Sequence, residues 1–458
     1  MPDFAGALHS LRDYYNTGAT LSYQFRKKQL LSLKDALKKY EEEINQALYE
    51  DLKKSKEEVW ATETGLLVSE INYARSHLKE WIKPERIGTD LVTFPSSAKI
   101  YKEPLGIVLI ISPWNFPLQL SLIPLVGAIA AGNCVVLKPS ELAPATENMI
   151  AKIVGKIFPE NYIMVIKGNG SEVVPALINQ TRFDHIFYTG STAVGREIYK
   201  LAANDIIPVT LELGGKSPCI VYDDADIKVS AKRIVLGKFF NVGQACIAPD
   251  YALVHAGVKE KFLNEVKNSI QKFYSDDAST AYGYGKIINQ KRFDKLVTYI
   301  KPGNIFYGGN HNRQKLYIEP TVLKDVSMDD DIMREEVFGP ILPVLSFTST
   351  EEAMSMVSKN EKPLSFYLFT SSKNIENEWI RKIQFGGGCI NNAAWHFTNK
   401  RMPFGGIGNS GIGAYHGKNT FDVFSHAKPL LKTSTAIDIS LKYPPFKNKL
   451  GFFKKFIR

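Results

Sequence analysis

The residue best suited to covalent chemistry is Cys246, the last residue of the segment Gly243 to Cys246. Its surroundings predict a boundary between a loop and a helix. Such a position can lower the pKa of a thiol and free the thiolate to attack carbon. A lone cysteine is more often a small buried hydrophobe, which is our interpretation of Cys134 and Cys219 in apolar strands. No histidine lies near Cys246 in the sequence, so a Cys/His pair has no local support.

Two other segments offer groups that could assist a nucleophile. Residues 113–117 place Asn115 between two prolines. This could fix the amide as a donor to a developing oxyanion, or it could be only a stiff turn. Glu212 precedes a pair of glycines and could be a surface residue, or a general base if burial raises its pKa. Residues 335–340 form an acidic and aromatic loop that says little on its own.

Two segments could bind a nucleotide. Lys138 and Glu141 follow a short strand and could hold the hydroxyls of a ribose, or form a solvated turn. Residues 190–195 lie between a strand and a helix but lack the middle glycine of GxGxxG, so they are a weak dinucleotide motif. A helix N-terminus at this place would still offer free N–H groups and a positive dipole end to a phosphate.

The elements that must position these residues follow from hydrophobic periodicity. Residues 8–53 and 57–81 predict helices, and residues 84–103 predict a hairpin or an edge strand. Strands and helices then alternate, which predicts an open parallel sheet with helices on both faces and ligands at the carboxyl ends of its strands. The expected strands are 105–111, 134–137, 162–166, 185–188 and 209–211, and the expected helices are 121–131, 145–157 and 193–203.

A second α/β unit is expected from about residue 214 to residue 400, followed by a glycine-rich segment at 403–417. Its strands are predicted at 219–221, 251–255, 343–347 and 365–369.

The composition indicates a globular, water-soluble protein. Of 458 residues, 44% are hydrophobic and 23% charged. The first four residues lack the start of a cleaved signal peptide, and prolines interrupt the apolar stretch 105–137, so neither secretion nor a spanning helix is expected. Four cysteines without a CxxC pair favour a reduced, cytoplasmic setting and disfavour a zinc site or a disulfide framework.

The net charge of +10 is concentrated at the C-terminus. Residues 442–458 carry six lysines and arginines and no acidic residue, so the excess is poor evidence for nucleic-acid binding. Leu450, Phe453 and Phe456 or Ile457 fall on one helical face among these cations. The tail could be a solvated, frayed end, or an amphipathic helix lying on an anionic membrane.

In this order and at these separations, the motifs resemble the aldehyde dehydrogenase superfamily over about residues 5–430, and within it the class 3 and fatty aldehyde dehydrogenase branch. The superfamily motifs are 113–117, 138–141, 190–195, 211–217, 243–246 and 336–340; the branch is indicated by 209–219, 248–251, 403–417, 424–426 and 443–445.

The resemblance implies a role for each residue. Cys246 would be the nucleophile, Asn115 with the backbone N–H of Cys246 the oxyanion hole, and Glu212 the base for the deacylating water. The remaining positions would hold the cofactor: Lys138 and Glu141 at the adenosine ribose, Gly190 and Ser191 under the pyrophosphate, Glu336 at the nicotinamide ribose, Phe338 beside it, and Trp114, Gly195 and Leu213 around them.

The resemblance also implies the activity and the architecture. We expect NAD(P)-dependent oxidation of medium- or long-chain aliphatic or aromatic aldehydes, without a metal. A CoA-acylating enzyme on the same fold and a non-catalytic scaffold are the alternatives. Glu141 favours NAD, but the branch often accepts NADP, so both are expected. The substrate funnel is expected from the Trp114 loop, Phe240 and residues 391–398, which include Trp395, His396 and Phe397.

The expected domains are a Rossmann-like cofactor domain at 1–83 and 104–212 and an α/β catalytic domain at 213–400. Residues 84–103 and 401–430 would form a dimerisation arm, and 431–458 the basic tail. The start of the chain close to its first helices is a class 3 feature that implies a homodimer. Fatty aldehyde dehydrogenases end in a membrane anchor, so a peripheral location at the inner membrane surface is a further expectation.

Overall fold

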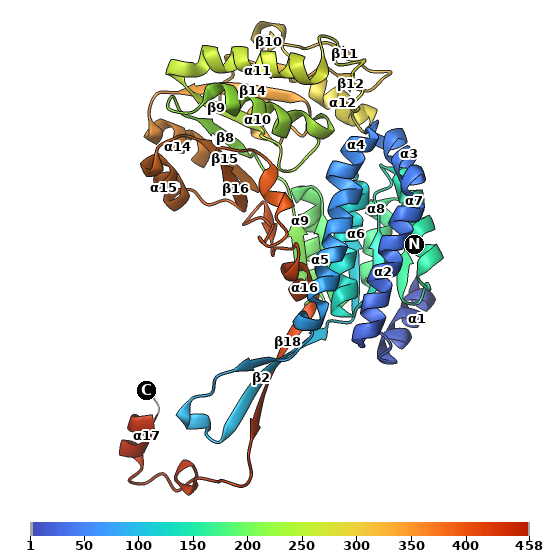
Figure 1. Cartoon of the computed structure of the whole chain (residues 1–458), viewed down its shortest axis with the longest axis vertical. Coiled ribbons are helices and arrows are strands. Elements are labelled where there is room, and N and C mark those ends of the chain that lie inside the picture. The colour runs from blue at the N-terminus through green and yellow to red at the C-terminus, as the bar shows by residue number, and fades with distance from the viewer. Residues whose placement is uncertain (1–2, 457–458) are drawn as a thin grey trace.

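The computed structural model describes residues 3–456 (Figure 1). Two mostly parallel sheets with their helices make up the body, and a narrow antiparallel arm projects from it. The expected α/β class is therefore confirmed. Within the described residues, no helix has the length and apolar character needed to cross a membrane.

The first sheet has six strands in the order β17-β7-β6-β3-β4-β5, all parallel except β17. All five strands expected in this region are present, with ends that differ by up to two residues. Their bounds are β3 Ile107–Ile111, β4 Cys134–Lys138, β5 Ile163–Val165, β6 His185–Thr189, β7 Val209–Glu212 and β17 Gly411–Ile412.

The chain builds this sheet outward from β3 in two directions. It passes through β4 and β5 on one side, returns, and adds β6 and β7 on the other. Because crossovers between parallel strands are right-handed, this reversal puts the first pair of helices and the second pair on opposite faces. It also opens a crevice between the carboxyl ends of β3 and β6, where such sheets bind ligands. The helices are α6 Pro117–Ala131, α7 Pro144–Ile157, α8 Gly170–Gln180 and α9 Thr192–Ala203.

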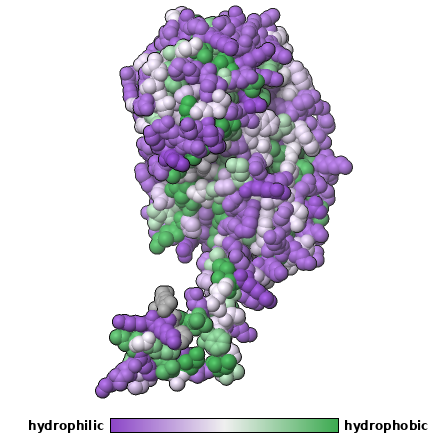
Figure 2. Space-filling model, turned by 60° about the vertical axis from the view of Figure 1, so that its left-hand side comes forward, coloured by the Kyte–Doolittle hydropathy of each residue, from purple (hydrophilic) through white to green (hydrophobic). Residues whose placement is uncertain are grey.

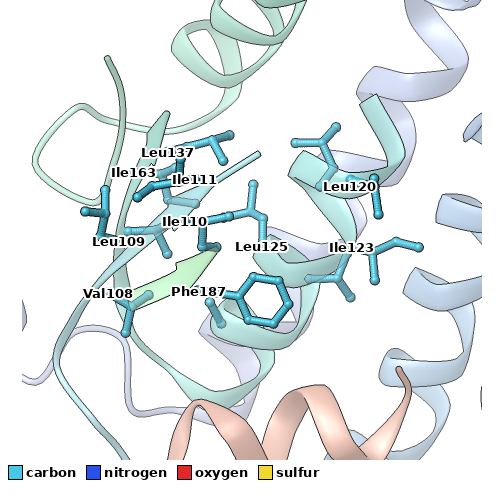
Figure 3. Close-up of a cluster of buried hydrophobic side chains, with 14 of the residues drawn as sticks. Val108, Leu109, Ile110, Ile111, Leu120, Ile123, Leu125, Leu137, Ile163 and Phe187 are labelled. Carbon is cyan, nitrogen blue, oxygen red and sulfur yellow. The ribbon is translucent and has the colours of Figure 1, made fainter. Parts of the chain in front are cut away.

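The centre of the core lies between β3 and α6. Figure 3 shows Val108, Leu109, Ile110 and Ile111 of β3 beside Leu125 of α6, among other apolar side chains. Strands covered on both faces are apolar throughout rather than alternating. All of α6 is buried because the N-terminal helices pack over it, which explains the uncharged stretch at 105–137. The N-terminal elements are α1 Ala5–Asn16, α2 Tyr23–Lys39, α3 Glu41–Leu52, α4 Lys56–Val59, a π-helical turn η1 Trp60–Thr64 and α5 Gly65–Trp81. Of these, α2, η1 and α5 contact α6.

The second sheet has seven strands in the order β10-β13-β14-β9-β8-β15-β16, of which only β10 is antiparallel. The four strands expected here are present. The bounds are β8 Pro218–Val221, β9 Tyr251–His255, β10 Ile305–Tyr307, β13 Thr321–Leu323, β14 Ile341–Phe347, β15 Ser365–Phe369 and β16 Gly387–Ile390, with a two-stranded β11 His311–Asn312 and β12 Tyr317–Ile318 beside them.

Helices and short 3₁₀ turns connect these strands. The helices are α10 Ile227–Phe239, α11 Lys259–Tyr274, α12 Gln290–Val297, α13 Asp331–Arg334, α14 Thr350–Ser358, α15 Lys373–Lys382 and α16 Lys418–Val423, and the 3₁₀ turns are η3 Phe240–Gly243, η4 Ala256–Val258, η5 Pro302–Asn304 and η6 Trp395–Thr398.

The arm is a three-stranded antiparallel sheet in the order β1-β2-β18, which confirms the expected hairpin. Beyond β18 the chain continues as a tail with a short C-terminal helix (Figure 1). Along β18, all residues but the first are exposed. The bounds are β1 Glu85–Ile87, η2 Leu91–Thr93, β2 Ser96–Pro104, β18 Ser425–Thr433, η7 Ser440–Lys442 and α17 Leu450–Phe456; Ile457 and Arg458 of the expected tail face lie outside the described residues.

Arg26 ties α2 to the end of α6. The side chain is 4% exposed, and its guanidinium donates to the carbonyls of Thr20 (3.0 Å) and Ala130 (3.1 Å). Burial lowers the pKa of Arg26 to about 10, so it stays charged at neutral pH.

We expect Arg26→Met to lower the free energy of unfolding by about 2–4 kcal/mol, because two buried carbonyls lose their donor at roughly 1–3 kcal/mol each. Urea unfolding followed by tryptophan fluorescence measures the change. Arg86→Met, at an exposed position of β1, is the matched control and should cost nearly nothing. Equal stabilities of the two variants would contradict this account of Arg26.

Candidate active site

A cavity of about 430 Å³ opens at the carboxyl ends of β3, β6 and β7, between the two sheets. Nine of the twelve residues predicted for the site line it, and Lys138, Glu141 and Gly195 do not. The nine are Trp114, Asn115, Gly190, Ser191, Glu212, Leu213, Cys246, Glu336 and Phe338.

Asn115 lies in the loop that joins β3 to α6 and is 3% exposed. Its side-chain amide donates to the carbonyl of Gln244 at 3.1 Å, two residues before Cys246. One amide N–H therefore anchors the side chain, and the second is available to a group inside the cavity. The proline-bracketed turn thus brings an amide donor beside the predicted nucleophile.

Cys246 follows the turn η3, in which Asn241 and Val242 have left-handed backbone conformations. The predicted boundary with a helix is wrong, because a turn leads from Cys246 to β9 and no helix begins there. The lowering of the thiol pKa that such a boundary can produce is not found at Cys246. Burial, with the charges of Glu336 and Glu212, raises the pKa of Cys246 instead.

Glu212 ends β7, where it pairs with Gly411 of β17. It is 2% exposed, and neither carboxylate oxygen has a hydrogen-bond partner among residues 3–456. Burial raises the pKa of Glu212 well above its usual value. A carboxylate in this state accepts a proton readily once it is ionised, as a general base must.

Lys138 and Glu141 form a polar corner beyond β4. Lys138 is 1% exposed and donates to Glu141 at 3.0 Å, and Glu141 also accepts from the backbone N–H of Gly170 at 3.1 Å. Burial acts to raise the pKa of Glu141, but hydrogen bonds from its own backbone N–H, from Gly170 and from Lys138 outweigh burial and the pKa is lowered. Lys138 is buried, whereas the side chain of Glu141 is 36% exposed, so the alternative of a solvated turn is excluded for Lys138 alone. The corner could hold two neighbouring hydroxyls.

The segment after β6 suits a diphosphate. Ser191 caps the twelve-residue helix α9 by accepting from the N–H of Val194 at 3.4 Å. Gly190, Ser191 and Thr192 line the cavity, so the N-terminus of α9, whose first N–H groups have no partner inside the helix, lies in the cavity wall. A Cβ on Gly190 would lie 2.2 Å from the hydroxyl of Tyr188, so no larger residue fits. Gly195 packs α9 against Leu213 rather than lining the cavity.

Glu336 and Phe338 lie on the loop between α13 and β14. A Cβ on Gly214 would lie 2.0 Å from a carboxylate oxygen of Glu336, so the glycine makes room for this side chain. Burial, and next the charge of Asp250, raises the pKa of Glu336 to about 8. Phe338 meets Trp114 edge to face, with 5.4 Å between ring centroids.

A buried ion pair that the sequence analysis missed holds this loop. Lys216 pairs with Asp250 and donates to the carbonyls of Ile332 (2.7 Å) and Glu335 (3.0 Å). Asp250 in turn accepts from the N–H of Val337 at 2.8 Å. The position of Lys216 directly after the two glycines was the only indication in the sequence.

The predicted funnel is partly correct. Trp114, Phe240 and Phe397 line the cavity, whereas Trp395 is 52% exposed and His396 lies outside it. The sequence analysis missed three lining residues in and beside the glycine-rich segment, namely Phe404, Tyr415 and His416. Their aromatic character was a possible indication.

The chain belongs to the aldehyde dehydrogenase family, because residues 3–430 match the sequence model of that family. It is 44% identical over 447 residues to 4,4'-diaponeurosporen-aldehyde dehydrogenase of Staphylococcus aureus, covering 97% of each chain. It is 41% identical to aldehyde dehydrogenase family 3 member B1 of Rattus norvegicus, covering 98% of this chain and 96% of the relative. These relatives confirm the class 3 resemblance.

Solved structures agree. A substrate-bound AldH of Staphylococcus aureus superimposes with a TM-score of 0.98 at 43% identity, covering 100% of both chains. A betaine aldehyde dehydrogenase of the same organism in complex with NAD+ gives a TM-score of 0.84 at 28% identity, covering 96% and 91%. The protein is thus an oxidoreductase that acts on aldehydes, in a family that uses NAD(P).

The raised thiol pKa predicts how Cys246 reacts in the absence of ligands. Alkylation by iodoacetamide should accelerate about tenfold per pH unit and still be rising at pH 9, since the thiolate fraction grows until the pKa is reached. Mass spectrometry of the labelled peptides measures the rate at Cys246 separately from that at the other cysteines. The same preparation of Cys389→Ala is the control. A rate that levels off near neutral pH would mean a low-pKa thiol.

Proposed function

We propose that the chain oxidises aldehydes to carboxylic acids through a thioester on Cys246. The observation that carries the proposal is the placement of Cys246, Asn115 and Glu212 around one cavity. The Cys246 thiolate attacks the aldehyde carbon and gives a thiohemiacetal. The amide of Asn115 and the backbone N–H of Cys246 stabilise its oxyanion, and losing one such donor typically costs roughly 10²–10³ in rate.

Residues in the cavity wall and at the neighbouring end of β4 fit NAD(P). Lys138 and Glu141 would hold the adenosine ribose, the N-terminus of α9 behind Gly190 and Ser191 the diphosphate, and Glu336 the nicotinamide ribose. The chemistry that a bound nicotinamide supplies is the acceptance of hydride, which leaves a thioester on Cys246. Glu141 offers hydrogen bonds to a 2′-hydroxyl but is only partly enclosed, at 36% side-chain exposure, so we propose that both NAD and NADP are used.

Glu212 is the proposed base of the second half-reaction. It takes a proton from water, the resulting hydroxide attacks the thioester carbon, and the carboxylic acid leaves as the Cys246 thiolate is restored. Two uncommitted carboxylate oxygens and a raised pKa support this role. Water rather than CoA is therefore the proposed acceptor.

The proposed substrates are aldehydes with a long apolar or aromatic tail. Phe240, Phe397 and Phe404 in the cavity wall support this choice. The Staphylococcus aureus relative that is named for 4,4'-diaponeurosporenal points the same way.

Reduced-cofactor absorbance tests the proposal with NAD or NADP and aldehydes from acetaldehyde to hexadecanal. We expect turnover with both cofactors that improves with chain length and is absent in Cys246→Ala. Glu212→Gln should keep a first-turnover burst and lose about 10²–10⁴-fold in the steady state, because only deacylation lacks its base. The steady-state rate of the unchanged chain should rise with pH as Glu212 ionises, and this rise should vanish in Glu212→Gln.

Product analysis completes this test. Free acid with or without CoA supports hydrolysis, whereas an acyl-CoA product would show the acylating alternative. Folded protein without turnover on any aldehyde would leave the scaffold alternative standing.

The arm is a proposed site of homodimerisation. Figure 2 shows hydrophobic side chains on the arm and tail at the bottom of the view. An exposed antiparallel sheet with apolar side chains is costly in water and is commonly covered by a partner. Exposed fractions on the arm are 73% for Leu91, 53% for Phe94, 53% for Leu430 and 50% for Leu431.

The tail is proposed to attach the enzyme to an anionic membrane. Leu450 is 64% and Phe446 54% exposed, and Phe446 also contacts Phe453 of α17 at 5.7 Å between ring centroids. Lysines surround these side chains, and each cation near an anionic surface contributes about 1 kcal/mol. Such a location would bring the cavity to long-chain aldehydes dissolved in the bilayer.

Flotation with anionic liposomes tests the tail. The full chain should float, and a chain that ends at Pro445 should stay at the bottom with its activity on short aldehydes intact. Neutral liposomes are the control for charge. Sedimentation velocity of the same two chains should give a dimer for both, because the arm remains. Equal flotation of the two chains would refute the membrane role, and monomers would refute the role of the arm.

A further inference from the structure

A second buried ion pair lies behind the wall of the cavity. The ammonium of Lys54 is 2.7 Å from a carboxylate oxygen of Glu63, and both side chains are fully buried. Lys54 lies between α3 and α4, and Glu63 lies in the π-helical turn η1. Turns of this kind inside helices often mark functional sites.

Lys54 binds the loop that carries Asn115. Its ammonium also donates to the backbone carbonyl of Asn115 at 3.2 Å and lies 4.1 Å from the ring centroid of Phe116. The side-chain amide of Asn241 donates to the same carbonyl at 2.7 Å. Since a carbonyl oxygen accepts two hydrogen bonds, the Asn115 peptide is held from two directions.

Glu63 binds the other end of the same loop. Its second carboxylate oxygen accepts from the backbone N–H of Gln119, in the first turn of α6, at 2.8 Å. The ion pair therefore spans the segment from Asn115 to Gln119 and fixes both of its ends. Burial raises the pKa of Glu63, but the charge of Lys54 and the hydrogen bonds to the carboxylate oppose that rise.

The same network reaches the loop of the nucleophile. Asn241 donates to the carbonyl of Gln244 at 3.0 Å, and that carbonyl also accepts from the amide of Asn115 at 3.1 Å. The backbone N–H of Asn241 donates to Glu58 at 2.9 Å. The amide of Asn115 and the Cys246 loop are thus fixed relative to one another by α4, η1 and the turn η3.

We infer that Lys54 and Glu63 are positioning residues for the oxyanion hole. The inference rests on the proposed function, since it assigns them the aim of the Asn115 amide. A buried ion pair is often no more stabilising than apolar residues of equal volume. What this pair adds is a fixed orientation of the segment from Asn115 to Gln119, through hydrogen bonds to both of its ends. Orientation matters at a reacting carbonyl, where a misplacement of about 1 Å can cost about 10²-fold in rate.

The test removes both charges of the pair at once with Lys54→Met/Glu63→Gln, so that neither partner is left buried without the other. The glutamine can still accept from Gln119. We expect the single-turnover rate of aldehyde oxidation to fall about 10–100-fold. Cofactor affinity and the rate of iodoacetamide labelling at Cys246 should stay within about twofold, since neither uses the oxyanion hole. Lys56→Met/Glu42→Gln removes a matched but exposed pair, 2.6 Å apart, and should change nothing.

A double-mutant cycle with Asn115→Ala separates aiming from general support of the fold. If the pair acts through Asn115, introducing Lys54→Met/Glu63→Gln into the Asn115→Ala variant should lower the single-turnover rate by less than about a further threefold. A full 10–100-fold loss in both backgrounds would overturn the inference, as would an unchanged rate in the pair variant. If Asn115→Ala alone is harmless, the proposed oxyanion hole fails first and the inference falls with it. Should the pair variant not fold, Glu63→Gln alone enters the same cycle.

Discussion

Parallel pairing of β3, β6 and β7 is the constraint on which the site depends. In the register, Ile111 lies beside Tyr188, and Thr189 lies beside Glu212. All three strands therefore end at one edge, and the loops that follow them must share one space. Segments about a hundred residues apart in the chain therefore meet there because of the strand pairing, and no motif in the sequence links them to one another. The second sheet supplies the rest of the wall through the loops at Cys246 and Glu336.

Desolvation then divides the charged groups of the site into two sets. Lys54, Lys216 and their carboxylate partners are buried but hydrogen-bonded, so they are fixed and hold backbone in place. Glu212 is buried with no partner in the described chain, and the thiol of Cys246 is desolvated and faces negative groups. The buried ion pairs make the loops around the cavity rigid. Glu212 and Cys246 have raised pKa values, which a bound ligand can change. Both sets follow from the same low-dielectric surroundings.

The sequence predicts the first sheet well because buried parallel strands are short, uninterrupted apolar runs with glycine or proline at their ends. It misses α8, which begins at Gly170 and contains Pro175, both poor helix formers, although Asn169 caps it by accepting from Ser171. Among the site residues, motifs identify Cys246, Asn115 and Glu212. Lys54 and Asn241 stand in segments without a motif, and the motif 248–251 gives Asp250 no role of its own. Only the contacts in the folded chain show what these three residues do. The raised pKa of Cys246 has the same origin, since burial by the assembled walls is a property of the folded chain.

The raised pKa of Cys246 has a consequence for the life of the protein in the cell. An enzyme that handles aldehydes works among electrophiles and oxidants, and these attack thiolates far faster than thiols. Burial and the neighbouring carboxylates favour the protonated thiol of Cys246, which reacts slowly with such compounds. The surroundings that oppose ionisation of Cys246 therefore also slow its unwanted modification. Compounds that are selective for exposed cysteines of low pKa should for the same reason react slowly with Cys246.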